Sequence, residues 1–227
     1  MRAMILAAGR GERMRPLTDT LPKPLIPVAG KPLIQWHIEK LAAAGITDIV
    51  INHAWLGARI EETLQDGRQW GVHIRYSAET NALETAGGIA TALTLLGEEP
   101  FLVMNGDIWC DWEPSQALQI AELLPLHQQQ AWLLLVPNPA HHPDGDFGLT
   151  ASGLITNDTS PRYTFAGIGV YKPSLFAQTL PQQPAKLAPL LREAIARQCI
   201  SGQLHLGRWV DVGTPERLNT LECILRN

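Results

Sequence analysis

The chain has 227 residues, of which 45% are hydrophobic and 18% are charged. This composition excludes an intrinsically disordered chain, which holds too little apolar material to bury. A chain of this length buries roughly 70% of its unfolded surface on folding, so it needs no disulfide or metal to form a core. We therefore expect one domain that spans residues 1–227.

Charge is distributed unevenly along the chain. Residues 1–31 hold six arginines and lysines against two carboxylates, a net charge of +4, whereas the whole chain carries −4, which leaves −8 for the remainder. A basic segment on an acidic body indicates a local anion site. The acidic body argues against a nucleic-acid partner, because nucleic-acid binding requires an extended basic face.

The cysteines and the apolar runs bear on the cellular compartment. Cys110, Cys199 and Cys223 form no C-x-x-C pair, which predicts reduced thiols and neither a zinc site nor a disulfide framework. The early apolar run at residues 3–8 is too short for a signal peptide, and no run approaches the ~18 residues of a membrane span. We expect a cytoplasmic protein with no membrane partner.

Short apolar strands alternate with helices in the first 136 residues. The spacing predicts strands at Met4–Ala7, Asp48–Asn52, Val72–Tyr76, Phe101–Met104 and Trp132–Val136, and helices at Leu33–Ala44, Ala58–Gln65 and Thr85–Leu96. This alternation predicts an α/β fold with a doubly wound, mostly parallel, Rossmann-like sheet.

The second half of the chain is less regular. Short, partly antiparallel strands are predicted at Leu149, Leu154–Ile155 and Phe165–Tyr171, followed by a helix over Lys186–Arg197. A C-terminal helix is predicted over Pro215–Leu225, with Thr214 as its N-cap. This half therefore predicts a small second lobe on the sheet.

Residues 6–18 read L-A-A-G-R-G-E-R-M-R-P-L-T and are followed by L-P-K-P at residues 21–24. A glycine-rich loop after a strand can bring backbone N–H groups against a phosphate. Met14 stands where a dinucleotide fingerprint has its third glycine, and no Walker A Gly-Lys-Ser/Thr follows. The two glycines alone are equally compatible with a basic surface turn. Phosphate is favoured by the density of cations at Arg10, Arg13, Arg15 and Lys23.

Two aspartates follow apolar segments. Asp107 ends the run F-L-V-M-N-G-D, and Asp211 lies within G-R-W-V-D-V-G-T-P. The carboxyl ends of parallel strands open onto the ligand crevice of such a sheet. Carboxylates together with phosphate oxygens are the usual ligands of Mg²⁺. Taken alone, either aspartate could instead close a surface turn.

These motifs resemble those of the sugar-1-phosphate nucleotidyltransferases, also called nucleotide-sugar pyrophosphorylases. Residues 9–24 are similar to that family's G-x-G-[TS]-R-[LM]-x-P-L-T…P-K signature, and residues 27–34 to its next block. Residues 207–215 are similar to its W-x-D-[VIT]-G-T-P block, so the resemblance covers essentially the whole chain. It implies in-line attack by a sugar 1-phosphate on the α-phosphorus of an NTP, which gives a nucleotide-sugar and pyrophosphate.

The resemblance also implies roles for individual residues. Arg13 and Lys23 are expected to be catalytic, and Asp107 and Asp211 to hold Mg²⁺ as cofactor. Nucleotide contacts are expected at Ala8, Gly9, Gly11, Glu12, Arg13, Lys23, Glu79, Thr85 and Gly88.

Two glutamates depart from the family's pattern on the nucleotide side. Glu12 replaces a threonine or serine, so it either points away from the triphosphate or meets the ribose or a metal. Glu84 replaces a glycine of the family's L-G-T-A-G-[GA] loop, so base contacts cannot be copied directly. Thr85 is placed to cap the helix that follows, to contact the base, or to do both.

The acceptor side departs further from the family. The family's Glu-Lys-Pro segment is replaced by I-T-N-D-T-S at residues 155–160, and Phe165 replaces an asparagine. These changes suggest a bulkier or more acidic sugar. Sugar-phosphate contacts are expected at Asn105, Gly148, Asn157 and Gly167. Trp109 and Trp112 are expected to line the crevice, and His141-His142 to lie in an exposed loop.

The resemblance favours UTP as the donor and N-acetylmuramate 1-phosphate as the acceptor, in the recycling of peptidoglycan. Guanylyl transfer to mannose 1-phosphate and nucleotidyl transfer to glucose 1-phosphate are the alternatives. A non-catalytic regulatory subunit that binds a nucleotide-sugar is a different class, and the missing third glycine disfavours an oxidoreductase. We divide the chain into a nucleotide-binding part at about residues 1–136, a sugar-binding lobe at about 137–206, and a metal loop with the C-terminal helix at 207–227. The oligomeric state stays open.

Overall fold

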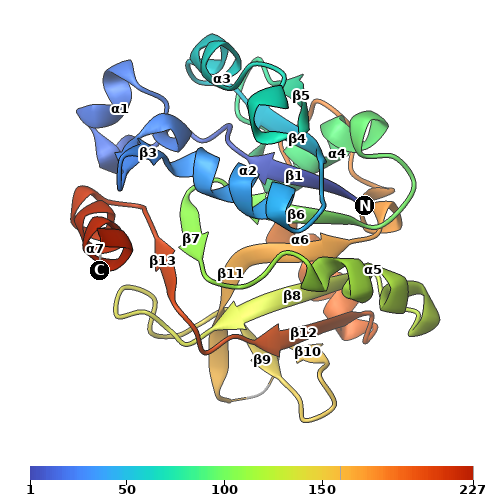
Figure 1. Cartoon of the computed structure of the whole chain (residues 1–227). Coiled ribbons are helices and arrows are strands. Elements are labelled where there is room, and N and C mark those ends of the chain that lie inside the picture. Colours follow the sequence, from blue (N-terminus) through green and yellow to red (C-terminus); the bar gives the residue numbers. More distant parts are fainter. Residues whose placement is uncertain (159, 227) are drawn as a thin grey trace.

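The computed structural model describes residues 1–158 and 160–226. Helices cover both faces of a central sheet (Figure 1). The strands are β1 (Arg2–Leu6), β2 (Pro27–Val28), β3 (Lys31–Pro32), β4 (Asp48–His53), β5 (His73–Ala78), β6 (Phe101–Asn105), β7 (Ile108–Cys110), β8 (Ala131–Val136), β9 (Phe147–Leu149), β10 (Ile155–Thr156), β11 (Arg162–Tyr171), β12 (Ile200–Leu204) and β13 (Trp209–Asp211). The α-helices are α1 (Leu17–Thr20), α2 (Leu33–Ala43), α3 (Gly57–Leu64), α4 (Glu84–Leu96), α5 (Gln116–Leu126), α6 (Leu187–Ala196) and α7 (Pro215–Arg226), and the 3-10 helices are η1 (Glu12–Met14), η2 (Lys23–Leu25), η3 (Arg68–Trp70) and η4 (Pro173–Phe176).

Nine strands of the described residues form one sheet. Strands β5, β4, β1 and β6 are neighbours and parallel, as the doubly wound prediction requires. β11 joins this group antiparallel to β6 and also pairs with β8, which is parallel to β12. The start of β11 continues into an antiparallel ladder with β9 and β10. The predicted mostly parallel sheet with a small antiparallel extension is confirmed, and the sheet is continuous from the first half of the chain into the second.

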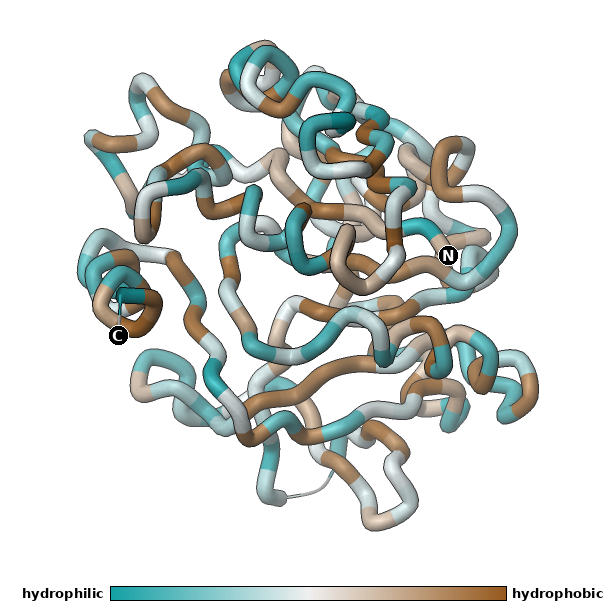
Figure 2. Tube along the Cα trace, in the orientation of Figure 1, coloured by the Kyte–Doolittle hydropathy of each residue, from teal (hydrophilic) through white to brown (hydrophobic). Residues whose placement is uncertain are grey.

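The core lies in two layers because strand side chains alternate between the faces of the sheet. Ala3 and Ile5 belong to the buried cluster under α2, α3 and α5. Met4 and Val50 point the other way, into the cluster under α4 and α6. Figure 2 shows hydrophobic residues along the central strands and hydrophilic ones on much of α3. None of the described helices is long and apolar enough to cross a membrane.

Several elements were not predicted from the sequence, namely β2, β3, β7, β12, β13, α1, α5 and the four 3-10 helices. β7 has three residues and β2 and β3 have two each, which is too short for an alternation to be recognised. α5 buries only Ala117 and Leu124 and contains Pro125, so its helical pattern is weak. At the other end of the chain, the predicted N-cap is confirmed, because Thr214 Oγ1 accepts a 3.4 Å hydrogen bond from the N–H of Arg217.

Candidate active site

A cavity of about 450 Å³ opens at the carboxyl ends of β1 and β6. This is the edge where a parallel sheet presents its ligand crevice. Most of the residues expected from the sequence line it together, namely Ala8, Gly9, Gly11, Glu12, Arg13, Lys23, Glu79, Thr85, Asn105 and Asp107. Gly213, from the loop after Asp211, lines it as well.

The glycine-rich loop is shaped for close approach to its backbone. Gly11 has a φ of +70°, and a Cβ there would lie 2.9 Å from Cγ2 of Thr18, so this position requires glycine. Its carbonyl accepts 2.9 Å bonds from the N–H of Met14 and from Oγ1 of Thr18, which fixes the turn. At Gly9, a Cβ would meet no protein atom within 4 Å. The loop therefore presents bare backbone to the cavity.

The four cations of this segment divide into two pairs. Arg10 donates to the carbonyl of Thr18 and to Asp19, at 2.7 and 2.9 Å, and its guanidinium lies 3.9 Å from the ring centre of Trp55. Arg15 also binds Asp19, at 2.8 Å. These two arginines tie the loop to α1 and do not line the cavity. Arg13 and Lys23 line it.

Lys23 and Asp107 form an ion pair on the cavity wall. Nζ of Lys23 lies 2.6 Å from Oδ2 of Asp107, and the residue Lys23 is 7% exposed. Desolvation strengthens such a pair and leaves the buried ammonium dependent on an anion. Oδ1 of Asp107 accepts no hydrogen bond from any residue that the structure describes. The carboxylate therefore keeps one oxygen for a ligand.

The two aspartates come together on a short antiparallel ribbon made by β7 and β13. Asp211 pairs with Ile108, and the N–H of Val212 donates to the carbonyl of Asp107 at 2.8 Å. The side chain of Asp211 accepts a 2.8 Å bond from Arg217 and lies 3.4 Å from Nε2 of His141. Asp107 lines the cavity and Asp211 does not, so the ribbon relates the two residues through their backbone. Carboxylate oxygens are hard ligands of the kind that suit Mg²⁺.

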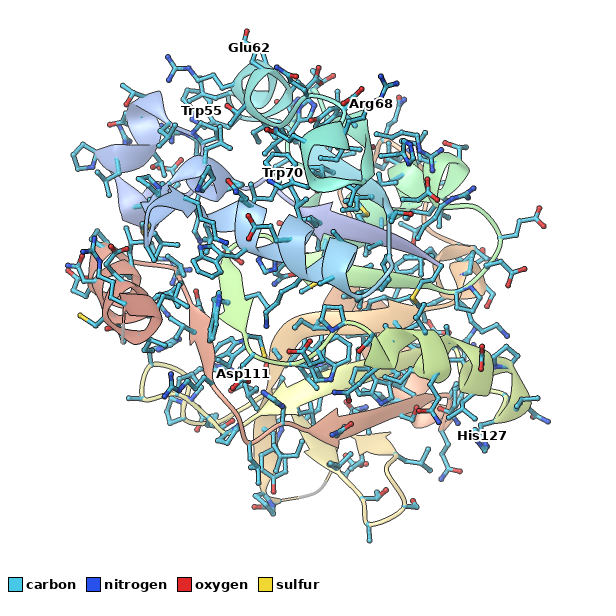
Figure 3. All side chains as sticks on the ribbon, in the orientation of Figure 1. Trp55, Glu62, Arg68, Trp70, Asp111 and His127 are labelled. Carbon is cyan, nitrogen blue, oxygen red and sulfur yellow. The ribbon has the colours of Figure 1, made fainter. Side chains whose placement is uncertain are left out.

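The opposite end of this ribbon is held by a second group of polar side chains. His205 lies 2.5 Å from Asp111, which also accepts a 2.9 Å bond from the N–H of Arg208 (Figure 3 labels Asp111). Burial acts to raise the pKa of Asp111, but these two hydrogen bonds outweigh it and lower that pKa below its ordinary value. Burial raises the pKa of the neighbouring Cys110 thiol to about 11. This group holds the ribbon in place from outside the cavity.

A buried carboxylate supports the wall opposite the glycine-rich loop. Glu79 accepts a 2.7 Å bond from the side-chain amide of Asn52 and a 2.9 Å bond from the N–H of Leu83. Asn52 in turn accepts a 2.9 Å bond from the N–H of Ala7. A Cβ at Gly88 would lie 2.8 Å from Oε1 of Glu79, so Gly88 supports this network from behind the cavity. The network joins β1, β4 and the loop before α4.

The loop before α4 explains one departure from the family pattern and corrects one prediction. Glu84 has a φ of +59°, the left-handed conformation that glycine adopts without strain. Glu84 also begins α4, and no side chain caps the helix, so the interpretation of Thr85 as a cap is wrong. The carbonyl of Ala185 takes that role by accepting bonds from the N–H groups of Ala86 and Gly87, at 2.9 and 3.1 Å.

The acceptor-side residues are only partly brought together. Gly167, with a φ of +75°, leaves room for Asn105, because a Cβ there would lie 2.6 Å from its Nδ2. Gly148 is buried in β9, opposite Thr156 of β10. Asn157 is half-buried and donates at 3.3 Å to the carbonyl of Arg192. Of these four residues, Asn105 lines the cavity and the other three do not.

The expectation that Trp109 and Trp112 line the crevice is wrong. They are 8% and 2% exposed, and neither lines the cavity. Trp112 stacks on Trp132, with ring centres 5.7 Å apart, and Trp109 packs in the cluster that holds α7. The rings of Trp109 and Trp112 therefore add apolar area to the core and not to the crevice wall.

Three residues of the site escaped the sequence analysis. Asn52 is a polar residue at the end of a predicted strand, a signal that could have been used. Arg217 lies in the first turn of α7, where its sequence position looks like a solvated helix surface. His141 is exposed, as expected for its loop, yet its Nε2 contacts Arg217 at 2.6 Å. No motif indicated that contact.

Comparisons with known proteins identify the family and the fold of the chain. The chain is 54% identical to an N-acetylmuramate alpha-1-phosphate uridylyltransferase of Neisseria meningitidis, over 99% of this chain and 98% of the relative. A Caulobacter vibrioides protein of the same name is 34% identical, with 94% and 92% covered. A solved UDP-glucose pyrophosphorylase complexed with UDP-glucose has the same fold, with a TM-score of 0.77 over 99% of this chain and 98% of that one at 22% identity. The protein-family model described as Nucleotidyl transferase matches residues 2–226 of the chain. The chain therefore belongs to the nucleotidyl transferase family.

Proposed function

We propose that the chain transfers a uridylyl group from UTP to N-acetylmuramate 1-phosphate and releases pyrophosphate, as a step in the recycling of cell-wall sugar. The observation that carries the proposal is the 54% identity, over nearly the full length of both chains, to a relative named for that reaction. The mannose-1-phosphate guanyltransferase of Aspergillus fumigatus is more distant, at 33% identity, and this chain covers 64% of its length.

The two walls of the cavity suit the two parts of a nucleoside triphosphate. The glycine-rich loop with Arg13 offers backbone N–H groups and a guanidinium, which bind phosphate oxygens. The opposite wall, from Glu79 to Thr85, carries no lysine or arginine and suits the uncharged nucleoside. We assign the phosphates to the first wall and the nucleoside to the second.

The chemistry needs little from the protein beyond alignment and charge. An oxygen of the sugar 1-phosphate attacks the α-phosphorus, a new P–O bond forms, and the bond to pyrophosphate breaks. The attacking phosphate has a second pKa of about 6, so it is an anion at neutral pH and needs no general base. Lys23 would neutralise charge at the transferred phosphoryl group, and Arg13 would stabilise the departing pyrophosphate.

We further infer that Asp107 and Asp211 hold Mg²⁺. Each carboxylate has a free Oδ1 among the described contacts, and its Oδ2 is bound to a cation, Lys23 or Arg217. When bound, Mg²⁺ would supply charge neutralisation for the reacting phosphates. On the acceptor side, Asn105 is the residue best placed to meet the sugar, with Gly167 giving it room. The positions of Gly148 and Asn157 give no support to their predicted contacts.

The proposal is tested by measuring pyrophosphate release with a panel of NTPs and sugar 1-phosphates. We expect UTP with N-acetylmuramate 1-phosphate to give the highest kcat/KM, at least about tenfold above GTP with mannose 1-phosphate, a difference of about 1.4 kcal/mol in transition-state stabilisation. A preference for the mannose pair would overturn the substrate assignment. Absence of release with every pair would overturn catalysis and favour a nucleotide-sugar-binding subunit.

A further inference from the structure

Arg217 points from the first turn of α7 back toward the loop that precedes the helix. Its Nη1 donates to Oδ2 of Asp211 at 2.8 Å and to Nε2 of His141 at 2.6 Å. Its side chain is 18% exposed, unlike the arginine at the end of the same helix, Arg226, which is 71% exposed. A guanidinium held this far from solvent, with two partners from separate segments, is more than a surface ion pair.

A second guanidinium reaches the same place. The position that a Cβ of Gly213 would occupy lies against Nη2 of Arg217, 3.0 Å from Nη2 of Arg13 and 2.9 Å from Oδ1 of Asp211. Gly213 and Arg13 both line the cavity. Two positive groups therefore converge beside one carboxylate, which leaves an excess positive charge at the cavity wall. Nη2 of Arg217 donates to no residue that the structure describes.

We propose that Arg217 is a second arginine of the site, and that its guanidinium binds phosphoryl oxygens of the reacting phosphates. The identity of those phosphates rests on the proposed function. We favour the leaving pyrophosphate as the ligand, because the guanidinium of Arg13, on the glycine-rich loop, approaches Gly213 from beside that of Arg217. The acceptor's phosphate is the other source, since residues 155–160 supply no lysine there.

The chemistry of the group fits this ligand. A guanidinium presents several N–H donors in a fixed plane and binds two phosphate oxygens at once, whereas an ammonium acts as a point charge. Nη1 can keep Asp211 and His141 in place while Nη2 faces the anion. Arg217 therefore links the loop of His141 and the aspartate ribbon to the phosphate end of the cavity.

The test compares Arg217→Ala and Arg217→Lys with the matched control Arg226→Ala on the same helix. Binding of Mg²⁺-pyrophosphate is measured by calorimetry, and the KM values of UTP and N-acetylmuramate 1-phosphate by pyrophosphate release. We expect Arg217→Ala to weaken pyrophosphate binding about ten- to a hundredfold, the scale of a hydrogen bond to a charged group. Arg217→Lys should lose part of the affinity for pyrophosphate, and Arg226→Ala should lose none of it. Thermal unfolding of each variant checks that it is folded.

The outcomes separate the two phosphate sources and the two proposals. A raised KM for the sugar 1-phosphate with unchanged pyrophosphate binding would assign Arg217 to the acceptor. Unchanged affinities for all three ligands in folded Arg217→Lys and Arg217→Ala would overturn the inference while leaving the proposed function intact. Weakened pyrophosphate binding in a protein that turns over no sugar 1-phosphate would overturn the proposed function and leave this inference standing. If Arg217→Ala does not fold, Arg217→Lys decides alone.

Discussion

The two sides of the cavity are built in different ways. The phosphate side comes from one continuous segment, residues 8–13, with Lys23 close behind it in the chain. The acceptor side and the aspartate ribbon are assembled from single residues on separate elements, among them Asn105 at the end of β6 and Arg217 on α7. A side built from one segment is contained in one continuous motif, whereas a side built by tertiary packing also draws on residues outside every motif, such as Arg217.

The same contrast appears within the basic segment itself. Six arginines and lysines crowd residues 1–31, yet only Arg13 and Lys23 line the cavity. Arg10 and Arg15 are held by Asp19, and Lys31 lies 3.7 Å from the ring centre of Trp36. Charge density pointed to the segment that lines the cavity but overstated the number of its cations that do so. Paired substitutions therefore compare a cation that lines the cavity with a cation of the same segment that does not.

The largest effect is expected at Lys23. Lys23→Ala should lower kcat by about a hundredfold or more, the scale for loss of one electrostatic stabiliser at a reacting centre. Lys31→Ala, a matched change outside the cavity, removes a part-buried ion pair with Glu39 and should leave kcat within about twofold of wild type. Steady-state pyrophosphate release measures both. Near-wild-type turnover of folded Lys23→Ala would break the assignment of the phosphate side.

Arg13 and Arg15 form the second pair. Arg13→Ala removes a guanidinium from the cavity wall and should lower kcat/KM about ten- to a hundredfold. Arg15→Ala loses only its exposed contacts with Asp19 and Glu12 and should change kcat/KM about twofold or less. Equal losses in the two variants would show that the segment acts through its overall charge.

Asn105 and Asn157 test the acceptor side. Asn105→Ala should raise the KM of the sugar 1-phosphate roughly three- to tenfold, the value of one neutral hydrogen bond, with the KM of UTP unchanged. Asn157→Ala should have almost no effect, because its amide is engaged with the carbonyl of Arg192 outside the cavity. If Asn157→Ala raised the acceptor KM instead, the lobe would have to close onto the cavity when the sugar binds.

The smallest effect is expected at Asp111, which binds His205 and the N–H of Arg208 at the end of the β7–β13 ribbon farthest from Asp107. Because the folded pKa of Asp111 is lowered, its ionised form contributes stability that is present above the unfolded pKa of about 3.9 and lost as the pH falls through the folded pKa. Asp111→Asn should therefore unfold at a lower temperature than wild type at pH 6, with the gap narrowing below pH 4. A gap independent of pH in thermal unfolding scans would contradict this.

An element could be predicted from the sequence when its apolar pattern was long enough to be recognised. Five strands and the doubly wound fold class followed from apolar runs that alternate with helices, because this alternation permits few architectures. The β7–β13 ribbon could not be predicted, since its strands have three residues each and pair across about a hundred positions. It is nevertheless the element that joins Asp107 to Asp211.

The role of a single residue could be predicted best where the local backbone requires that residue type. Gly11 sits in a left-handed turn and Gly88 against a buried glutamate, so each position has a steric reason for glycine. The tryptophans carried no such constraint, and the burial of Trp109 and Trp112 depended on which core layer they met. Arg217 needed the tertiary fold, because its neighbours His141 and Asp211 come from different segments.

The most direct test of the account is to incubate the full chain with UTP, N-acetylmuramate 1-phosphate and Mg²⁺ and to identify the products by mass spectrometry. The account expects UDP-N-acetylmuramate and pyrophosphate in equal amounts, with both lost together in Lys23→Ala and retained in Lys31→Ala. Consumption of UTP without a nucleotide-sugar, or equal product from both variants, would contradict it.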